Sequence, residues 1–467
     1  MQGRKEKKAA VRPIKRRDWN MTIRIPPQTA AVMEGLERSG FEAYAVGGCV
    51  RDRLLGLEPK DWDVTTSALP EQAEHALANF QIAETGLKHG TITVVSGGMP
   101  VEVTTYRIDG PYSDNRHPDG VTFTRSLEDD LARRDFTVNA MACGLSGEIV
   151  DRFGGREDLG RKLIRCVGNP DARFHEDGLR ILRALRFSSV LGFSIEEKTG
   201  LAVLKNCSLL GGISAERSAK ELSALLCGKN AAAVLRDYRG VIGVLIPELR
   251  AEFDFPQDNP YHCFDVWEHT VNAVERIEPD PLLRLVMLLH DIGKPSCRTT
   301  DQNGVGHFYG HGKKSAELSK KVLKRLKYDG KTIRTAAALI RWHDLPLNGN
   351  EKLILRRLNL LGEKNLRLLI KIRAADIQAQ APEHLSRLNS LAEASGTLEK
   401  VLAQGPCFSR KDLAVNGSDL LKAGIPPGRE IGQTLDSLLE AVLDGRCPNA
   451  KEDLLRLAEK MKGGSEA

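Results

Sequence analysis

Two features that mark other classes of protein are missing from this sequence. Its nine cysteines include no Cys-x-x-Cys pair, which indicates neither a zinc ribbon nor a disulfide scaffold. No apolar run approaches the length that spans a bilayer. A basic start, with eight Lys or Arg and one Glu in residues 1–17, is not followed by the apolar stretch of a signal peptide. We therefore expect reduced thiols, no membrane partner and a cytoplasmic location.

Length and composition are those of an ordinary globular protein. With 467 residues the chain is too long for one hydrophobic core, so two to four domains are expected. Hydrophobic residues make up 41% and charged residues 28%, and both values are usual. The net charge of +6 permits a polyanionic partner without requiring one. Residues 1–21 are expected to form a disordered, solvated extension, with a weak RNA-attracting arm as the alternative.

The most informative pattern begins at Val46. A short apolar run ends there in Gly47 and Gly48, and a helix-prone stretch that starts with Arg51 follows. Glycines at a strand-to-helix turn let the backbone approach a phosphate closely, and a helix N-terminus favours the anion. The segment therefore predicts a phosphate cradle, although a Gly-Gly pair alone is usually a plain turn.

Two carboxylates follow on a predicted strand. Asp61 and Asp63 point to the same face, because side chains of a strand repeat every two residues. Beside a phosphate cradle, this pair predicts a site for Mg²⁺ and a nucleoside triphosphate. Residues 101–107 predict a further alternating strand, in which Glu102 faces away from its apolar neighbours. Glu102 is either a third metal carboxylate or an exposed strand residue.

The pattern Gly-Gly-x-Val-Arg-Asp, followed about ten residues later by Asp-x-Asp, resembles the head domain of polymerase-β-like nucleotidyltransferases. It is similar to the bacterial branch that holds CCA-adding tRNA nucleotidyltransferases and poly(A) polymerases. Residues 131–141 match the family's Arg-Arg-Asp-Phe-Thr-x-Asn-Ala motif without departure. The resemblance implies nucleotide-binding roles for Arg133, Arg134, Asp135 and Asn139. Two adjacent arginines can hold ribose and triphosphate oxygens bidentately.

Three segments bear on which member of the family the chain resembles. Residues 108–125 are polar, contain glycine and proline, and predict a mobile loop similar to that of enzymes that add the terminal A. A plain surface loop is the alternative. Residues 88–95, which predict a turn and a strand, and the tail segment 416–432 resemble the tRNA enzymes more than the poly(A) polymerases.

Residues 175–187 predict one helix, because leucines recur at helical spacing. Asp177, Arg180 and Arg183 would then share another face. Cytosine and adenine both present an amino group beside a ring-nitrogen acceptor, so a carboxylate can accept from the first and a guanidinium can donate to the second. Uracil and guanine present a carbonyl and an N–H at these positions, so both contacts become repulsive. An ordinary surface ion pair is the alternative, but the family's Glu-Asp-x-x-Arg motif also assigns base selection to Asp177 and Arg180.

Histidines gather between residues 262 and 343. A histidine, then His-Asp, then a distant aspartate, all on predicted helices, resembles the HD phosphohydrolase superfamily. Imidazole and carboxylate together bind transition metals. A metal-free helical platform that only binds RNA is the alternative. The candidate ligands are His269, His290, Asp291 and Asp376, with His311 and His343 completing a second metal position.

The predicted fold class is α+β, with a small mixed-sheet nucleotidyltransferase head domain followed by all-helical neck, HD and tail domains. The resemblance covers nearly all of residues 22–467. The expected division is a basic extension over 1–21, a head over 22–150, a neck over 151–245, an HD domain over 246–385 and a helical tRNA-binding tail over 386–467.

The resemblance implies template-independent addition of C, C and A to the 3′ end of tRNA, with CTP and ATP as substrates and pyrophosphate as the product that leaves. Asp61 and Asp63 would hold two Mg²⁺ for this transfer. A poly(A) polymerase or an A-adding enzyme is the nearest alternative. The alternative from another class is a metal-dependent HD phosphohydrolase with an RNA-binding head, and a non-catalytic RNA-binding protein is a third. An HD phosphohydrolase activity can also accompany CCA addition.

Overall fold

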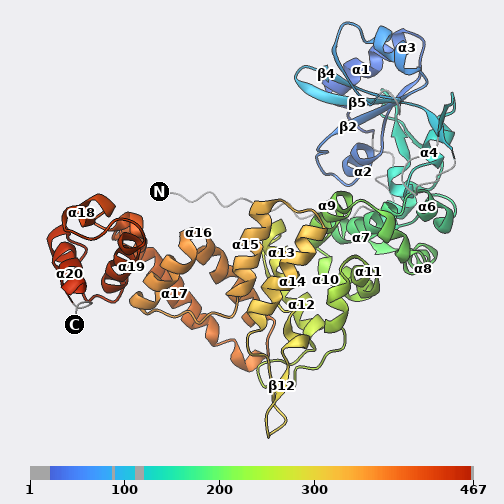
Figure 1. The fold of residues 1–467 in the computed structure, drawn as a ribbon. Coiled ribbons are helices and arrows are strands. Elements are labelled where there is room, and N and C mark those ends of the chain that lie inside the picture. The colour runs from blue at the N-terminus through green and yellow to red at the C-terminus, as the bar shows by residue number, and fades with distance from the viewer. Residues whose placement is uncertain (1–21, 87–89, 111–119, 464–467) are drawn as a thin grey trace, which may run out of the picture. The chain divides into compact units, whose positions relative to one another are not determined.

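The computed structural model describes residues 22–86, 90–110 and 120–463 (Figure 1). The basic extension over 1–21, the start of the predicted turn at 88–95 and the middle of the predicted loop at 108–125 lie outside the described residues. The chain forms two compact units, Met1–Pro247 and Glu248–Ala467. The finer division into head, neck, HD and tail domains stays a prediction.

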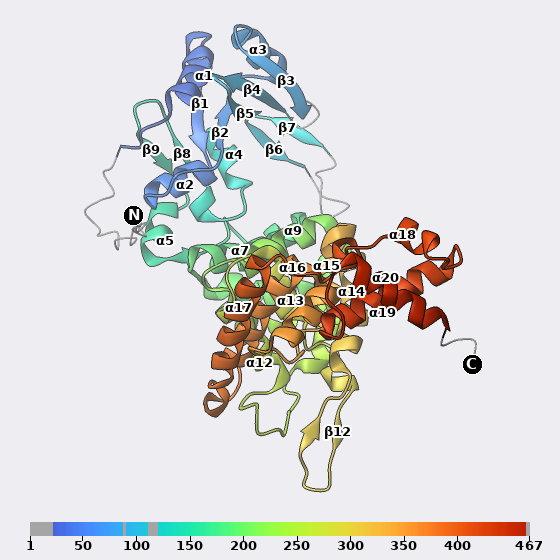
Figure 2. The same ribbon diagram turned by 90° about the vertical axis from the view of Figure 1, so that its left-hand side faces the viewer.

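The first unit is built on a seven-stranded mixed sheet with the order β3-β4-β5-β2-β1-β8-β9 (Figure 2). β2 and β5 are parallel and the other neighbours are antiparallel. Helix α1 (Pro27–Arg38) covers the sheet with Val32, Met33 and Leu36, which are fully buried. The strands are β1 (Ala43–Val46), β2 (Trp62–Thr66), β3 (Gln81–Gly86), β4 (Thr91–Ser96), β5 (Met99–Thr105), β8 (Met141–Cys143) and β9 (Ile149–Asp151).

Short elements complete this sheet region. The segment flanking residues 111–119, predicted to be loop, includes two short strands, β6 (Arg107–Asp109) and β7 (Val121–Phe123), which pair antiparallel. The prediction of loop over 108–125 was therefore wrong at both ends, where alternation over three residues is too short a signal to detect. The helices are α2 (Gly48–Leu54), α3 (Pro70–Ala76) and α4 (Leu127–Ala132), with the 3₁₀ turn η3 at Thr137–Asn139.

Helices follow the sheet in the first unit. Ile181, Leu182 and Leu185 of α7 are fully buried, and α7 packs against α9. A two-stranded parallel ladder, β10 (Leu163–Ile164) with β11 (Ser194–Ile195), lies between the helices. The helices are α5 (Gly155–Arg161), α6 (Pro170–Glu176), α7 (Leu179–Leu191), α8 (Glu197–Lys205), α9 (Ala215–Leu226), α10 (Ala231–Asp237) and α11 (Arg239–Leu245).

The second unit is helical apart from a small hairpin of β12 (Thr299–Thr300) and β13 (Gly306–His307). In the described ranges no helix combines the length and the apolar character that crossing a bilayer requires. The predicted α+β class is confirmed. The helices are α12 (Val266–Arg276), α13 (Pro281–Leu289), α14 (His311–Arg325), α15 (Gly330–Arg341), α16 (Glu351–Gln378), α17 (Arg387–Ala403), α18 (Gly417–Lys422), α19 (Arg429–Leu443) and α20 (Lys451–Gly463).

Helix α16 is interrupted at Gly362, whose φ of 73° and ψ of 161° are not helical. On the N-terminal side of this kink, Leu355 packs against the apolar core formed by α18, α19 and α20. Arg356 pairs with Asp444 at 2.5 Å on the same side. On the C-terminal side, Asp376 is buried among histidines. One long helix thus contributes to two different cores.

Candidate active site

Three carboxylates meet on the head sheet. The parallel register of β2 and β5 places Asp63 opposite Glu102, and Asp61 directly precedes β2. Burial, assisted by the charges of Asp61 and Glu102, raises the pKa of Asp63 to about 6 against the opposing charge of Arg134. Oxygen donors that repel one another fit a hard divalent cation. The structure therefore brings together the three acidic residues that the sequence singled out.

Gly47 forms the turn from β1 into α2. Its φ of 83° lies in the left-handed region that favours glycine. A Cβ at this position would lie 2.9 Å from Nη1 of Arg134. The backbone therefore approaches one of the two adjacent arginines closely. Arg51, in α2, donates to the side-chain oxygen of Asn139 at 2.6 Å.

Asp130, which was not predicted from the sequence, holds the arginine pair. Its side chain is fully buried and accepts from Arg133 at 2.8 Å and from Arg134 at 3.3 Å. It also accepts from the hydroxyl of Thr65, on the strand that carries Asp63, at 3.1 Å. Burial acts to raise the pKa of Asp130, but Arg133 and Arg134 lower it. An acidic residue three and four positions before two arginines was the available signal.

Asp135 links the head motif to α7. One carboxylate oxygen accepts from Asn139 at 3.0 Å, and the other lies 2.6 Å from Arg183. Burial alone would raise the pKa of Asp135, but Arg183 and the hydrogen bond from Asn139 lower it to about 2. Asp135, Asn139 and Arg183 therefore form one connected polar network, to which Arg51 is joined through Asn139.

The predicted single helix over 175–187 was wrong. Helix α6 ends at Glu176, Asp177 has an extended backbone (φ −141°, ψ 103°), and α7 begins after Gly178. Oδ1 of Asp177 accepts from the backbone N–H of Leu179 at 3.0 Å. A short polar residue followed by glycine favours this break, because each competes with helical backbone geometry.

The break changes the partners of the two base-selecting candidates. Asp177 pairs with Arg217, from α9, at 2.7 Å. Arg180 is held by Glu176 and donates to the backbone carbonyl of Arg133 at 2.9 Å. Asp177 and Arg180 therefore do not share a helix face as an ion pair. The role of this pair in base selection stays a prediction.

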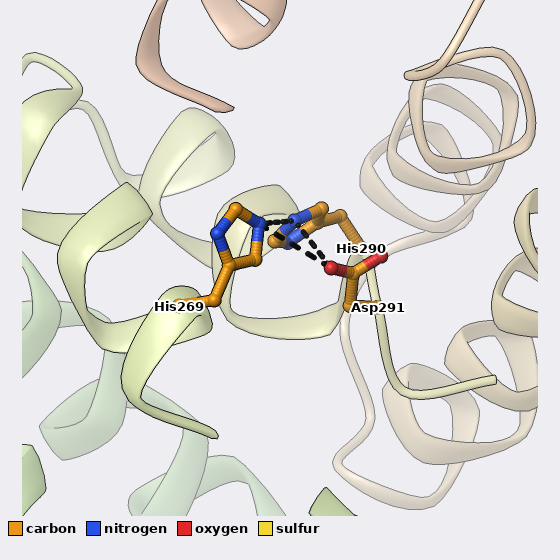
Figure 3. A group of neighbouring side chains, drawn as sticks. All are labelled: His269, His290 and Asp291. Carbon is orange, nitrogen blue, oxygen red and sulfur yellow. Dashed lines mark hydrogen bonds and ion pairs between the residues drawn. The ribbon is translucent and has the colours of Figure 1, made fainter. Parts of the chain in front are cut away.

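The six histidine and aspartate candidates of the second unit converge from five helices, α12 to α16, or from their ends. Figure 3 shows His269, from α12, facing His290 and Asp291, which directly follow α13. Their approaches are short: His269 Nε2 to His290 Nε2 is 3.3 Å, His290 Nε2 to Asp291 is 3.1 Å, His269 Nε2 to Asp376 is 3.1 Å, and His311 Nε2 to His343 Nε2 is 3.1 Å. Asp291 lies between the two histidine pairs.

Backbone carbonyls define the tautomer of these histidines. A carbonyl oxygen can only accept, so an Nδ1 that contacts one must carry the proton and Nε2 then presents its lone pair. Facing lone pairs at about 3 Å repel unless a cation lies between them, so the donor set fits a transition metal. The Nδ1 contacts are His269 to Ala379 at 3.2 Å, His290 to Met287 at 2.7 Å, His311 to Phe308 at 2.8 Å and His343 to Ile340 at 2.8 Å.

Lys294, which was not predicted from the sequence, also belongs to this centre. Its ammonium is almost fully buried, 2.8 Å from Asp291 and 2.8 Å from the side-chain oxygen of Gln257. Burial acts to raise the pKa of Asp291, but His290 and Lys294 hold it well below its usual range. A cavity of about 560 Å³ opens over the centre and is lined by Asp291, Lys294, His311, His343 and Asp376 among others.

Three family models match successive parts of the chain. A “Poly A polymerase head domain” matches residues 43–165. A “Probable RNA and SrmB- binding site of polymerase A” matches residues 192–253. A tRNA nucleotidyltransferase domain 2 matches residues 311–458. Together they cover both units.

Relatives match over nearly the full length. The CCA-adding enzyme of Geobacillus kaustophilus is 36% identical over 434 residues, covering 91% of this chain and 95% of the relative. That of Lactobacillus delbrueckii subsp. bulgaricus is 34% identical over 429 residues, with the same coverage. The crystal structure of the Bacillus stearothermophilus CCA-adding enzyme in complex with CTP has a TM-score of 0.71 at 31% identity, covering 95% of this chain and 99% of that chain.

A mixed-sheet head bearing three carboxylates, followed by helical units, defines a nucleotidyltransferase. Such an enzyme implies a divalent metal ion. The chain belongs to the family of CCA-adding enzymes.

Proposed function

We propose that this enzyme adds C, C and A in turn to the 3′ end of tRNA, using CTP and ATP and releasing pyrophosphate. The observation that carries the proposal is the group of Asp61, Asp63 and Glu102 beside Arg134. The full-length relatives are CCA-adding enzymes, which favours this activity over poly(A) polymerase or A-only addition. Because the proposed substrate is tRNA, we place the enzyme in the cytoplasm.

The head residues have distinct proposed roles. Asp61 and Asp63, with Glu102, would hold Mg²⁺, which when bound neutralises phosphate charge and lowers the pKa of the attacking 3′-hydroxyl. Gly47 leaves its turn free of a side chain, and Gly48 begins a helix, so that backbone N–H groups can face a phosphate. The remaining proposed nucleotide contacts come from the polar network, namely Arg51, Arg133, Arg134, Asp135, Asn139 and Arg183.

Base selection is proposed for Asp177 and Arg180. A carboxylate at Asp177 accepts from the amino group that cytosine and adenine share, and Arg180 donates to the neighbouring ring nitrogen. Arg217 and Glu176 hold these two side chains separately. The base would therefore meet groups that are already oriented, which lowers the ordering cost of binding.

One assay tests the proposed activity. A tRNA that ends at the discriminator base is incubated with CTP, ATP or both, and product lengths are measured. Addition of two nucleotides with CTP alone and of three with both is the expected result. Extension by many A residues would favour a poly(A) polymerase, and addition only to a tRNA already ending in CC would favour an A-adding enzyme.

The histidine centre supports a second activity, metal-dependent phosphoester hydrolysis. The residues that would hold a transition metal are His269, His290, Asp291, His311, His343 and Asp376. The metal supplies Lewis acidity to a phosphate oxygen when bound. Lys294 places a cation beside the carboxylate of Asp291, and this cation also attracts an anionic substrate. Opening of a 2′,3′-cyclic phosphate to a monoester, or release of phosphate from a phosphorylated substrate, is the expected result, and either should depend on an added transition metal.

A further inference from the structure

Apart from the basic start of the chain, the positive charge of this protein is concentrated in one helical hairpin. Residues 311–341, which form α14, the following turn and α15, contain ten Lys or Arg and two acidic residues, a net charge of +8. The whole chain carries +6, so all other residues together carry −2. A solvated surface normally mixes both signs. Apart from the basic start at residues 1–17, the hairpin is therefore unlike the rest of the chain in its charge.

Five lysines lie on the exposed side of α14, and we name them the α14 basic face: Lys313, Lys314, Lys320, Lys321 and Lys324. The opposite side is buried, with Val322 and Leu323 in the core. Lys313, Lys320 and Lys324 are seven and four residues apart, so they form one stripe along the helix. At 1.5 Å per residue the stripe is about 16 Å long.

Within the described residues, the lysines of the α14 basic face have no carboxylate partner. Within the described ranges no carboxylate oxygen lies within 4.0 Å of any of the five ammonium groups. Arg325, at the end of the same helix, does pair with Glu248, at 2.6 Å. Glu317 is the one acidic residue of α14. Like charges at i and i+4, such as Lys320 and Lys324, destabilise a helix slightly, so folding does not account for the arrangement.

We propose that the α14 basic face binds the phosphate backbone of RNA. Lysines are flexible point charges, which suit repeated phosphate contacts that carry no sequence information. The five positions include none of the aromatic or arginine anchors that protein partners use. The proposal rests on the proposed function, because tRNA is the RNA that this enzyme would meet.

The position of the face adds to the argument. Helices α14 and α15 pack side by side (Figure 1), and His311 and His343, at adjacent ends of the two, approach to 3.1 Å. Lys313 and Lys314 follow His311 within one helical turn. RNA held along α14 would therefore pass beside the cavity over the histidine centre. This contact is separate from the predicted tRNA-binding tail at residues 386–467.

The test compares two full-length triple variants with the same loss of charge. The first is Lys313→Gln/Lys320→Gln/Lys324→Gln. The control is Lys198→Gln/Lys229→Gln/Lys364→Gln, at exposed positions on other elements. Binding of tRNA is measured by filter retention between 50 and 200 mM salt, and thermal melting verifies that both variants fold. Each lost phosphate contact flattens the slope of log K against log[salt] by roughly 0.7–0.9, so a change of about 2 and at least about tenfold weaker binding are expected for the first variant.

Equal slopes and affinities for the two variants, with wild-type tRNA binding and CCA addition intact, would overturn this proposal alone. A wild-type protein that does not bind tRNA would overturn both the proposal and the proposed function. Vesicles containing phosphatidylglycerol serve as a second probe. If the wild type binds these vesicles and only the first variant loses that binding, while tRNA affinity is unchanged, the face binds a membrane surface. This outcome would also overturn the proposal.

Discussion

Asp177 pairs with Arg217, at 2.7 Å, and not with Arg180, which follows it by three residues. Arg180 has its own carboxylate partner, Glu176. Two groups with complementary charges are thus kept apart by separate partners, which leaves each able to contact a different atom of a base. A simple ion pair between them would have satisfied both groups without a ligand.

Replacing Asp177 tests base selection directly. Asp177→Ala removes the acceptor for the amino group and also the repulsion of the uracil carbonyl. We expect slower addition of CTP and ATP, relatively better use of UTP and GTP, and a loss of discrimination of roughly one to two powers of ten. Single-turnover addition of all four triphosphates measures it. Asp171→Ala, on α6 and paired with Lys205, is the control. A wild-type ratio of CTP to UTP incorporation in Asp177→Ala would assign Asp177 a structural role only.

A comparison of Gly47→Ala with Gly40→Ala distinguishes the effect of backbone strain from the effect of a side chain in the nucleotide site. The substitution strains a φ of 83° and places a Cβ 2.9 Å from Arg134. Gly40→Ala introduces a similar strain, at φ 86°, with nothing within 4 Å. Both should lose about 1–2 kcal/mol of stability, but only Gly47→Ala should also lose nucleotide addition. Equal activity of the two variants at a temperature where both are folded would contradict a phosphate contact at Gly47.

Asp130 is expected to position Arg133 and Arg134 for the triphosphate. Asp130→Asn weakens both contacts and removes a buried negative charge that the two arginines share, although Arg133 keeps its approach to Asp109 at 3.7 Å. KM for CTP and ATP should therefore rise at least about tenfold while kcat changes less. Steady-state kinetics with saturating tRNA measure KM and kcat separately. Asp129→Asn, the neighbouring acid that accepts from Thr124, is the matched control. An unchanged KM in folded Asp130→Asn would contradict the positioning role.

Binding of Mg²⁺ should depend on pH through Asp63. Its folded pKa of about 6 exceeds the ordinary 3.8, so the folded state holds more protons between these values. Stability of the metal-free protein therefore falls as pH rises through this window. Mg²⁺ displaces the proton, so its affinity should fall by up to about tenfold per pH unit below 6. Melting with and without Mg²⁺ between pH 5 and 8 measures both effects.

Asp63 and its neighbour Asp61 can each be tested by an asparagine variant. Asp61→Asn and Asp63→Asn should abolish addition while tRNA binding persists. Asp63→Asn should also melt at a higher temperature than the metal-free wild type above pH 6, because it removes a buried charge beside Asp61 and Glu102. A stabilisation by Mg²⁺ that is constant from pH 5 to 7 in the wild type would show that Asp63 does not compete with a proton for the ion.

Metal binding by the histidine centre should be separable from nucleotide addition. After dialysis against Mn²⁺ or Ni²⁺, His290→Ala and Asp291→Ala should retain less metal than the wild type. The loss of affinity should exceed the 10–100-fold that removal of an outer partner costs. CCA addition should stay within about twofold. His384→Ala, which contacts a backbone carbonyl outside the cluster, is the control. Full metal content and phosphohydrolase activity in both variants would place that activity elsewhere.

Local patterns predicted much of the head site. Alternation predicted that Glu102 lies on the opposite face from its apolar neighbours, and the Asp-x-Asp spacing predicted that Asp61 and Asp63 lie close together; their metal role stays a prediction. The approach of Asp63 to Glu102 could not be predicted, because it depends on parallel pairing between strands that are distant in sequence. The break at Asp177 was missed because the helix indicated by Leu179, Leu182 and Leu185 was extended backward, although the Asp-Gly pair before them is a turn signal.

In the histidine centre, too, the sequence predicted the residues but not their contacts. Residue types predicted six ligand candidates, and the structure brings all six together. The orientation of each imidazole is determined by a backbone carbonyl, such as that of Met287 for His290. Backbone atoms have no sequence signature, so these contacts could not be predicted. Lys294 was overlooked because a lysine is usually exposed.

The kink at Gly362 means that the apolar core formed by α18, α19 and α20 is discontinuous in sequence. This core takes Leu355 from the first half of α16, although the remainder comes from residues 407–458. The chain leaves this core near Gly362, contributes Asp376 to the histidine centre, and returns. Truncation at residue 386 would remove the predicted tRNA-binding tail and would also strip the partners from an apolar helix face, which promotes aggregation. A chimera that exchanges tails between relatives must therefore transfer both segments together.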